Sequence, residues 1–243
     1  MLPFFSSNLS HTMTRPLLLC GCLAAVLLFV GCDSNEPTVD EPTPSVLPLA
    51  VGNQWVLERT ETQIAPGTSD TTFFVRRDTI RIERDTTLAG ERWFVIDNFF
   101  GFQGLYAQRA DGIWHKPLNS PAAEPILRYK QPANVGEQYP ISLSPGQPDD
   151  IRVTVRSKDT IRITEAGSIA SYQYERSVYA IAIQGSPALP ITDAPLVLNT
   201  YLAPGVGFVE AENVYVRYNS EETAFVSAGR EEHWQLISYQ LSE

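Results

Sequence analysis

Hydrophobic and polar residues alternate along most of the chain after residue 47, with a period of two rather than the 3.6 of a helix. Residues 151–156 read Ile-Arg-Val-Thr-Val-Arg, so the aliphatic residues share one face of a predicted strand. No stretch of twelve residues has the spacing of an amphipathic helix. The pattern predicts one all-β antiparallel domain of about ten to twelve strands, either a sandwich or a strongly curled sheet. Further β-rich runs occupy residues 54–63, 79–83, 177–183, 198–202, 208–210, 214–218 and 233–241.

Turn-forming dipeptides separate these runs. Asp111-Gly112 lies between the β-rich segments 105–108 and 113–116, which is typical of a two-residue hairpin. Ala89-Gly90 separates two further runs. Gly52 is expected to adopt a positive φ in a turn that directs Trp55 into the core.

Two short motifs occur twice in the same order. Residues 48–55 read PLAVGNQW and residues 132–139 read PANVGEQY, while DTIRI occupies both 78–82 and 159–163. The offsets of 84 and 81 residues are nearly equal. They predict two related meanders, residues 47–131 and 132–243, packed together as halves of one domain.

The N-terminus departs from the alternating pattern. Arg15 precedes an apolar run of about fifteen residues, which fits a secretory signal better than a membrane span of roughly 20. Met13 is a plausible true start, which leaves residues 1–12 as additional leader. Residues 1–31 are therefore predicted to be a helical signal peptide.

The apolar run ends in Leu28-Phe29-Val30-Gly31-Cys32, which resembles the lipobox of bacterial lipoproteins. The resemblance implies that diacylglycerol is attached to the sulfur of Cys32, that cleavage precedes Cys32, and that the new amino terminus can be acylated. The membrane would then be a partner through the acyl chains on Cys32. The alternative is a buried cysteine inside a plain signal or anchor helix. Cys20-Gly21-Cys22 also resembles the motif, but only a few apolar residues precede it.

The residues after Cys32 are polar, acidic and rich in proline, as in a tether. Residues 32–46 are predicted to form this tether, and residues 47–243 the all-β domain. Fourteen tether residues span at most about 45 Å. Asp33 resembles an inner-membrane retention signal of some bacteria, yet we favour the outer membrane.

Two further motifs resemble a group of bacterial envelope lipoproteins. PLAVGNQW at 48–55 is similar to a PLxVGNxW opening, and YLAPGVGFV at 201–209 is similar to a YxAxGVGLV element near the C-terminus. The resemblance implies a secreted β-rich domain and carries no activity. Considered as structure alone, Gly205 and Gly207 permit a tight turn or bulge between two strands.

Composition narrows the function classes. With 43% hydrophobic and 10% aromatic residues, the 243-residue chain is not a long disordered protein. All three cysteines precede residue 33, so a disulfide scaffold is excluded. The net charge of −10 argues against a nucleic-acid partner.

The sequence offers little catalytic chemistry. His115 and His233 lack the spacing of a zinc motif, and no phosphate-binding or dinucleotide-binding glycine motif is present. Asp149-Asp150 follows a proline-rich loop, where a solvated loop or a weak calcium site is expected. We therefore predict no catalytic residue, no metal site and no cofactor.

Aromatic and basic residues leave two binding hypotheses open. The four tryptophans could line a sugar or lipid pocket, although core packing is the simpler interpretation. Four arginines could form a stripe that binds an anion, although salt-bridged surface residues are more common. The tryptophans are residues 55, 93, 114 and 234, and the arginines are residues 81, 152, 156 and 162.

These observations favour a non-enzymatic, lipid-anchored envelope lipoprotein that acts as a binding or scaffold module. One alternative is a carrier or receptor for an apolar ligand, with a curled sheet resembling the half-barrel of periplasmic lipoprotein carriers. An aromatic-lined cavity of several hundred Å³ would support the carrier. The other alternative is an envelope hydrolase, which would place a histidine beside a serine and a carboxylate.

Overall fold

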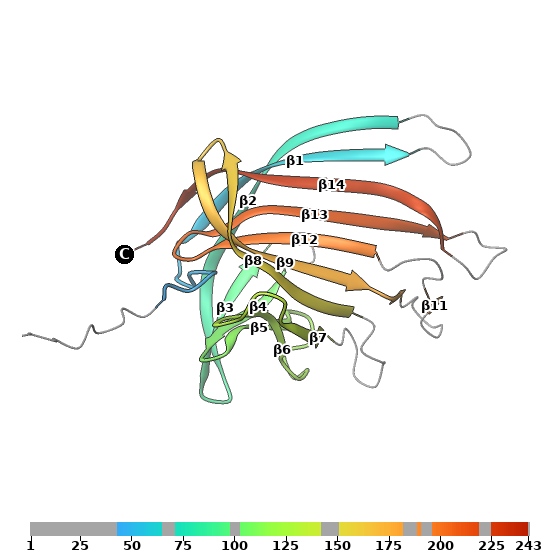
Figure 1. The fold of residues 1–243 in the computed structure, drawn as a ribbon. Helices are drawn as coiled ribbons and strands as arrows, with labels where there is room; N and C mark the ends of the chain where they lie inside the picture. Colours follow the sequence, from blue (N-terminus) through green and yellow to red (C-terminus); the bar gives the residue numbers. More distant parts are fainter. Residues whose placement is uncertain are drawn as a thin grey trace, which may run out of the picture. The chain divides into compact units, whose positions relative to one another are not determined.

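Alternating strands and glycine turns produce one large antiparallel sheet and one small one in the computed structural model of the protein (Figure 1). The structure describes residues 43–64, 71–97, 103–141, 151–181, 189–190, 196–218 and 225–242. Twelve strands follow the order β6-β5-β4-β3-β2-β1-β14-β13-β12-β9-β8-β7, and β10 pairs with β11. The predicted all-β class and curled sheet are confirmed. The strands are β1 (Gln54–Ile64), β2 (Thr71–Leu88), β3 (Glu91–Asp97), β4 (Gly104–Arg109), β5 (Gly112–Pro117), β6 (Ile126–Lys130), β7 (Gln138–Ile141), β8 (Ile151–Thr164), β9 (Gly167–Val178), β10 (Ala180–Ile181), β11 (Leu189–Pro190), β12 (Leu196–Ala203), β13 (Gly207–Tyr218) and β14 (Phe225–Gln240).

The two outer strands of the sheet, β6 and β7, meet and nearly close it into a barrel. The hydroxyl of Tyr139 on β7 donates a hydrogen bond to the carbonyl oxygen of Arg128 on β6, at 3.0 Å. The same hydroxyl accepts a hydrogen bond from the backbone N–H of Lys130, at 3.2 Å. Tyr174 on β9 donates to the carbonyl oxygen of Lys130 at 2.9 Å, which ties a third strand to this seam. Side chains therefore join these edges.

The barrel has two unlike ends. At one end, which we call the base, short turns at 89–90, 110–111 and 204–206 join neighbouring strands. The predicted hairpin is confirmed there, but its two-residue turn is Ala110-Asp111, one residue earlier than predicted, because Gly112 already pairs with Arg109. At the other, distal end the connections are residues 65–70, 98–103, 118–125, 142–150 and 219–224, most of which lie outside the described residues.

Residues 44–47 close the base, and we call this segment the plug. Val46 and Leu47 are fully buried. The side-chain amide of Gln131 accepts a hydrogen bond from the N–H of Val46 at 2.7 Å and donates to the carbonyl oxygen of Pro44 at 2.8 Å. Val46 lies within the predicted tether, so the fixed part of the chain begins earlier than the sequence indicates.

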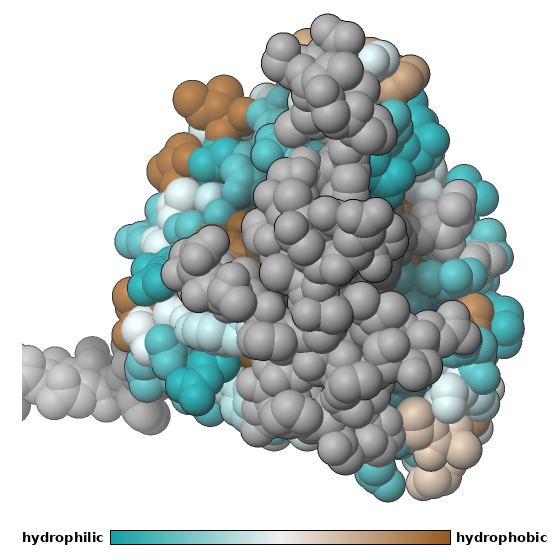
Figure 2. Space-filling view, turned by 90° about the vertical axis from the view of Figure 1, so that its right-hand side faces the viewer, coloured by the Kyte–Doolittle hydropathy of each residue, from teal (hydrophilic) through white to brown (hydrophobic). Residues whose placement is uncertain are grey.

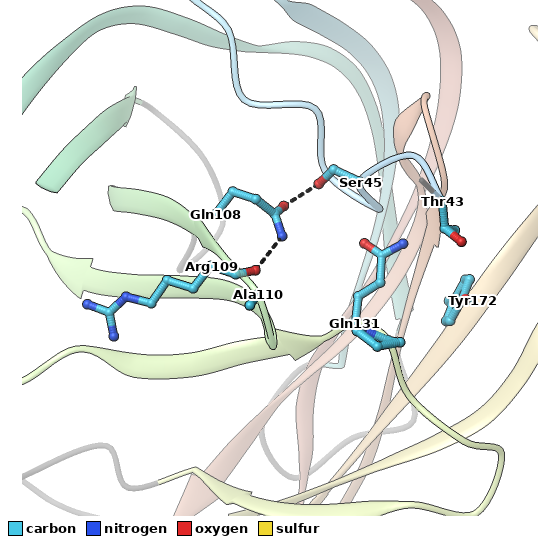
Figure 3. A pocket seen from close by; sticks show the side chains of 8 residues that line it. Thr43, Ser45, Gln108, Arg109, Ala110, Gln131 and Tyr172 are labelled. Carbon is cyan, nitrogen blue, oxygen red and sulfur yellow. Dashed lines mark hydrogen bonds between the residues drawn. The ribbon is translucent and has the colours of Figure 1, made fainter. Parts of the chain in front are cut away.

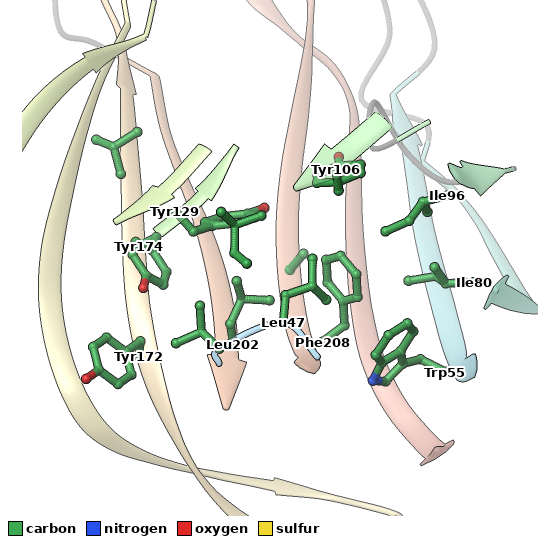
Figure 4. Packing of buried hydrophobic residues seen from close by; sticks show 14 of the residues in the cluster. Leu47, Trp55, Ile80, Ile96, Tyr106, Tyr129, Tyr172, Tyr174, Leu202 and Phe208 are labelled. Atoms are coloured by element: carbon green, nitrogen blue, oxygen red, sulfur yellow. The ribbon is translucent and has the colours of Figure 1, made fainter. Parts of the chain in front are cut away.

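Large aromatic side chains fill the interior next to the plug (Figure 4). Trp55 packs edge-on against Phe208 with ring centroids 5.6 Å apart, and its indole N–H donates to the carbonyl oxygen of Val206 at 2.6 Å. Gly207 has a φ of 101°, and a Cβ at that position would lie 2.7 Å from the Trp55 ring. This glycine is required because any other residue would collide with the indole. Gly52 also has the predicted positive φ, 97°.

The outer face of the sheet carries its own packing. Trp93, on β3, is buried in a small cluster with Val95, Leu105 and Ala107, and Trp114 packs against this cluster. Elsewhere, the β8–β9 hairpin from residue 157 to residue 171 folds over the outer face of β12–β14, and we call it the flap. There the side chain of Gln235 donates to the carbonyl oxygen of Ile163, at 2.9 Å.

Of the two repeated motifs, one has the same backbone structure in both copies and the other does not. In the first pair, the N–H groups of Gly52 and Gly136 donate to the carbonyl oxygens of Ile82 and Val155, so the two turns have the same backbone pattern. The DTIRI segments differ. Residues 80 and 82 are buried on β2, whereas residues 161 and 163 are exposed on the flap.

Residues 1–42 lie outside the described residues. The predicted signal helix, Cys32 and most of the tether fall in this range. In the part of the chain that is described, no helix has the length and apolar character needed to cross a bilayer.

Candidate functional site

Toward the distal end, the inward positions of β1 and β14 become charged. Trp55 and Leu57 on β1 are followed on the same face by Arg59 and Glu61, which are only 6% and 5% exposed. The Arg59 guanidinium lies 2.8 Å from the Glu61 carboxylate and 3.0 Å from that of Glu232. Arg230 completes the group at 3.3 Å from Glu232. Two positive and two negative groups make this quartet electrically balanced.

A second polar group faces the interior from β4, β6 and β9. Tyr129 on β6 and Tyr174 on β9 pack with ring centroids 5.1 Å apart, so these strands face each other across the barrel. Arg128 precedes Tyr129 and is 6% exposed, and Arg176 lies two residues beyond Tyr174 on the same face of β9. Tyr106 on β4 is fully buried next to them. We call Tyr106, Arg128 and Arg176 the arginine–tyrosine centre.

A β-bulge places Arg128 inside. In the register of β5 and β6, Ile113 pairs with Tyr129 and Trp114 pairs with Leu127, so Arg128 is the extra residue of the bulge. A bulge redirects a side chain that strict alternation would turn outward. This is why alternation along the sequence does not predict an inward arginine beside an inward tyrosine.

Electrostatics link the members of the centre. Burial, together with the nearby charge of Arg128, lowers the pKa of Arg176 to about 10. Burial and Arg128 together lower the pKa of His115 to about 4, so this imidazole is neutral at physiological pH. Burial also raises the pKa of the Tyr106 hydroxyl, which stays protonated. The centre therefore carries two positive charges and a neutral hydroxyl donor.

Hydrogen bonding leaves two donors of the centre without partners in the described part of the chain. Arg176 uses Nη2 to donate to the side-chain oxygen of Asn213, at 3.2 Å. Its Nε is buried and has no hydrogen-bond partner, and the same holds for the hydroxyl oxygen of Tyr106. Among the described residues Arg176 also forms no ion pair, in contrast to Arg59 in the quartet.

A cavity of about 440 Å³ lies at the base, beside the plug (Figure 3). Ser45 donates a hydrogen bond to the Gln108 side chain at 2.5 Å, and Gln108 donates to the carbonyl oxygen of Arg109 at 2.9 Å. The Arg109 guanidinium is held instead by Glu91, at 2.7 Å. Amide and hydroxyl groups thus share the lining with apolar ones. It is lined by Thr43, Ser45, Gln108, Arg109, Ala110, Gln131, Pro132 and Tyr172.

The predicted histidines lie on opposite faces of the sheet. His115 packs inside against Tyr106, with ring centroids 4.9 Å apart. His233 is on the outer face, where its Nε2 lies 2.9 Å from the Glu210 carboxylate. Arg162 of the flap pairs with the same carboxylate. Hydrogen bonding to Glu210 raises the pKa of His233. Within the described residues no three His, Cys, Asp or Glu side chains are grouped so that they could hold a metal ion.

The four arginines predicted as a stripe do not form one site. Arg156 binds Glu175 through two hydrogen bonds of 2.9 and 2.6 Å, and Arg162 binds Glu210. Arg81 donates to the Gln54 side chain, and Arg152 is exposed. These contacts correspond to the salt-bridged surface interpretation.

The four tryptophans that were candidates for a ligand pocket also lie on different faces of the sheet. Trp55 and Trp234 pack in the interior, whereas Trp93 and Trp114 belong to the outer cluster, so the tryptophans line no common pocket in the described structure. Cys32 and Asp149-Asp150 lie outside the described residues.

No protein-family model and no curated protein matches this chain. Three solved structures are similar to it. A "putative exported protein with YmcC-like fold" from Bacteroides fragilis is 11% identical, with a TM-score of 0.37, over 82% of this chain and all of that chain. A "putative lipoprotein" from Parabacteroides distasonis is 10% identical, with a TM-score of 0.38 and the same coverage. A "putative outer membrane lipoprotein-sorting protein domain" from Vibrio parahaemolyticus is 11% identical over 78% of this chain and 85% of that chain, with a TM-score of 0.16.

Proposed function

We propose that this chain is a lipoprotein of the bacterial cell envelope, held in a membrane by acyl chains on Cys32, and that it acts there as a non-enzymatic binding module. The lipobox resemblance at residues 28–32 supports the anchor. The main structural support is the plug, because its hydrogen bonds to Gln131 fix the chain to the base of the barrel soon after the predicted anchor.

The plug gives the proposed protein an orientation. Eleven residues lead from Cys32 to Thr43, and they reach at most about 36 Å at ~3.3 Å each. The base would therefore stay near the membrane, while the distal end is presented away from it. Figure 2 views that end, where the coloured surface is mostly hydrophilic with a few apolar groups. We favour the outer membrane as the location.

The inward side chains support a binding role more than catalysis. His233 meets a carboxylate, but the contacts of His233 and Glu210 in the described structure include no serine. His115 is buried and neutral next to Arg128. The arginine–tyrosine centre offers charge and hydrogen-bond donors, which are the groups that hold a polar ligand in place.

The same arrangement gives less support to a carrier of acyl chains. A carrier needs an apolar cavity, but near the plug the described interior is filled by aromatic residues such as Trp55, Tyr129 and Tyr174. The cavity at the base is lined by polar and apolar groups alike, so it is not the apolar cavity that a carrier needs. Toward the distal end the inward residues of β1 and β14 are charged.

Mass spectrometry of the full chain from the membrane fraction tests the anchor. We expect a mature N-terminus at Cys32 with an acyl mass, and we expect a Cys32→Ser variant to remain uncleaved and unmodified. Cys22→Ser, which alters the neighbouring motif-like cysteine, is the matched control and should be processed normally. Normal processing of Cys32→Ser, or a bare thiol on a freely diffusing protein, would refute the proposal.

A further inference from the structure

The distal half of β2 forms an open edge of the large sheet. Strand β3 pairs with β2 only from Arg81 to Leu88, whereas β1 pairs with residues 71–81 of β2. In the part of the chain that the structure describes, no strand pairs with residues 72–80 on the side away from β1. Figure 1 shows this half of β2 at the upper edge of the sheet, with β1 below it and no other strand above it.

The backbone groups that face this edge follow from the register. Ile82 directs both its N–H and its carbonyl oxygen toward the start of β1, since it donates to Asn53 and accepts from Gly52, each at 2.9 Å. Alternate residues of a strand point their backbone groups to the same side, and the register between β1 and β2 has no bulge. The odd-numbered residues of β2 therefore point theirs outward. The residues whose N–H and carbonyl groups face the open edge are Phe73, Val75, Arg77 and Thr79.

The side chains along the edge are apolar first and then basic. Natural proteins usually protect an exposed edge with proline, a bulge or charged residues. Here three consecutive apolar side chains are open to solvent, because Phe73 is 67% exposed, Phe74 48% and Val75 63%. Charged residues follow only from Arg76 onward, where the side chains of Arg76 and Arg77 are 56% and 60% exposed. The edge is thus unprotected over its apolar part.

The chain itself holds the two arginines loosely. Arg77 lies 3.8 Å from Glu58 and 3.9 Å from Glu165, and Arg76 lies 3.3 Å from Asp78. Exposed pairs of this kind contribute little to stability. Because the whole chain has a net charge of −10, this basic stretch also differs in sign from the protein around it. Acidic residues of a partner would therefore complement it.

We infer that the distal edge of β2 binds an extended segment of another polypeptide, which adds to the sheet as a further strand and carries acidic residues beside apolar ones. Main-chain hydrogen bonds to the odd-numbered residues supply the affinity, and the order of the side chains supplies the specificity. The inference rests on the proposed binding role and specifies the partner. In the orientation proposed above, this edge lies toward the distal end, away from the membrane.

A second copy of this chain fits the edge less well. Two copies of β2 related by a twofold axis pair antiparallel, so each odd-numbered residue must face an odd-numbered one. An axis centred on Arg76 or Arg77 sets like charges directly opposite each other, which is destabilising. An axis centred on Val75 avoids this, but it turns the two bases to opposite ends of the dimer. Both copies would be anchored through their bases in one membrane, which favours a different polypeptide as the partner.

Peptide binding to the full chain tests the inference. The probe is the peptide Ser-Glu-Glu-Val-Val-Val-Ser, and the control peptide has lysines in place of the glutamates. In an antiparallel register the probe sets valines opposite residues 73–75 and glutamates opposite residues 76–77. We expect fluorescence polarisation to show binding of the probe at least about tenfold tighter than of the control, because two attractive pairs become repulsive in the control.

Amide hydrogen exchange locates the bound peptide. Exchange should slow at Phe73, Val75 and Arg77, whose N–H groups face the edge. It should change little at Phe74 and Arg76, whose N–H groups already face β1. Equal slowing at odd and even positions would contradict strand addition at this edge.

The variant Val75→Pro separates edge pairing from folding. The N–H of Val75 faces the open edge, so proline removes a donor that the ladder with β1 does not use. Val75→Pro should weaken binding of the probe at least about tenfold, whereas the control Val75→Thr, which keeps the N–H, should bind like the wild type. If Val75→Pro does not fold, the double variant Arg76→Gln with Arg77→Gln carries the test, since it should remove the preference for the acidic peptide.

The inference is overturned if the acidic peptide does not bind, or if Val75→Pro and Val75→Thr bind it equally. A dimer of the chain alone that Val75→Pro dissociates would also overturn it, because the edge would then belong to a second copy. The anchoring at Cys32 is measured separately, so failure of the anchor and failure of this inference are distinguishable.

Discussion

The plug depends on a single side chain, and Gln131→Leu is the sharpest perturbation of it. The amide of Gln131 bridges the N–H of Val46 and the carbonyl oxygen of Pro44, and Gln131 itself is 7% exposed. Leucine keeps a comparable volume but can neither donate nor accept. The substitution therefore removes both hydrogen bonds while leaving the surrounding packing in place.

The expected cost follows from the burial of these groups. Two hydrogen bonds contribute about 1 kcal/mol each, and a buried N–H left without a partner costs about 1–3 kcal/mol more. The loss is thus about 3–5 kcal/mol. Burial of Val46 and Leu47 contributes about 3–6 kcal/mol, so the plug should remain seated but open far more often.

Hydrogen exchange measures that opening directly. The N–H of Gly205 donates to the carbonyl oxygen of Ser45, so its protection reports on the plug through a bond that the substitution does not touch. A loss of about 3–5 kcal/mol accelerates its exchange by roughly 150-fold to 5,000-fold. Gln108→Leu is the control, because Gln108 bonds the same serine from an exposed position and its loss should have a small effect. Equal Gly205 exchange in Gln131→Leu and the wild type would refute the role given to Gln131.

Two further predictions concern other parts of the fold. The pKa of His233 is raised by its hydrogen bond to Glu210. The contribution of this pair to the free energy of unfolding is therefore complete below pH 6.5, and it is lost as the pH rises through the pKa of His233 in the folded protein. Denaturant titrations at several pH values should show this loss in the wild type but not in His233→Gln. Because the site is half-exposed, the loss should stay below about 1 kcal/mol. The same dependence of unfolding free energy on pH in both proteins would contradict the prediction. Gly207→Ala should reduce the free energy of unfolding by about 2–5 kcal/mol, because it adds both backbone strain and a collision with Trp55. Gly90→Ala also has a positive φ but meets no atom within 4 Å, so the two variants should differ, and equal losses would disprove the collision.

Local features of the sequence were sufficient to predict the strands and their turns. Alternation at 151–156 and the Asp111-Gly112 dipeptide both reflect conformational preferences of residues that are adjacent in the sequence. The structure confirms a strand at the first and a hairpin at the second. The prediction for Gly52 succeeded for the same reason. Strand length was harder, because β2 begins at Thr71, eight residues before the predicted run at 79–83.

Contacts between distant parts of the chain could not be predicted in this way. Arg162 and Glu210 are separated by 48 residues, and their pairing depends on the flap folding over the outer face. The inward direction of Arg128 depends on a bulge that changes the alternation by one residue. An arginine on a strand that alternates by sequence is naturally assigned to the surface, so the inward position of Arg128 was not visible before the structure.

The difference between the two ends of the barrel connects these features. At the base, the turns are short, Gly207 permits close contact with Trp55, and Gln131 fixes the plug, so the strands and the chain entering from residue 43 are held tightly together. Toward the distal end, buried side chains become charged, as in Arg59, and the longer connections join the strands. Apolar burial stabilises the first end, whereas the buried Nε of Arg176 and hydroxyl of Tyr106, which have no hydrogen-bond partner among the described residues, cost stability. A protein anchored to a membrane through its base would therefore present its distal end to its surroundings, on the side where these buried donors could meet a bound ligand.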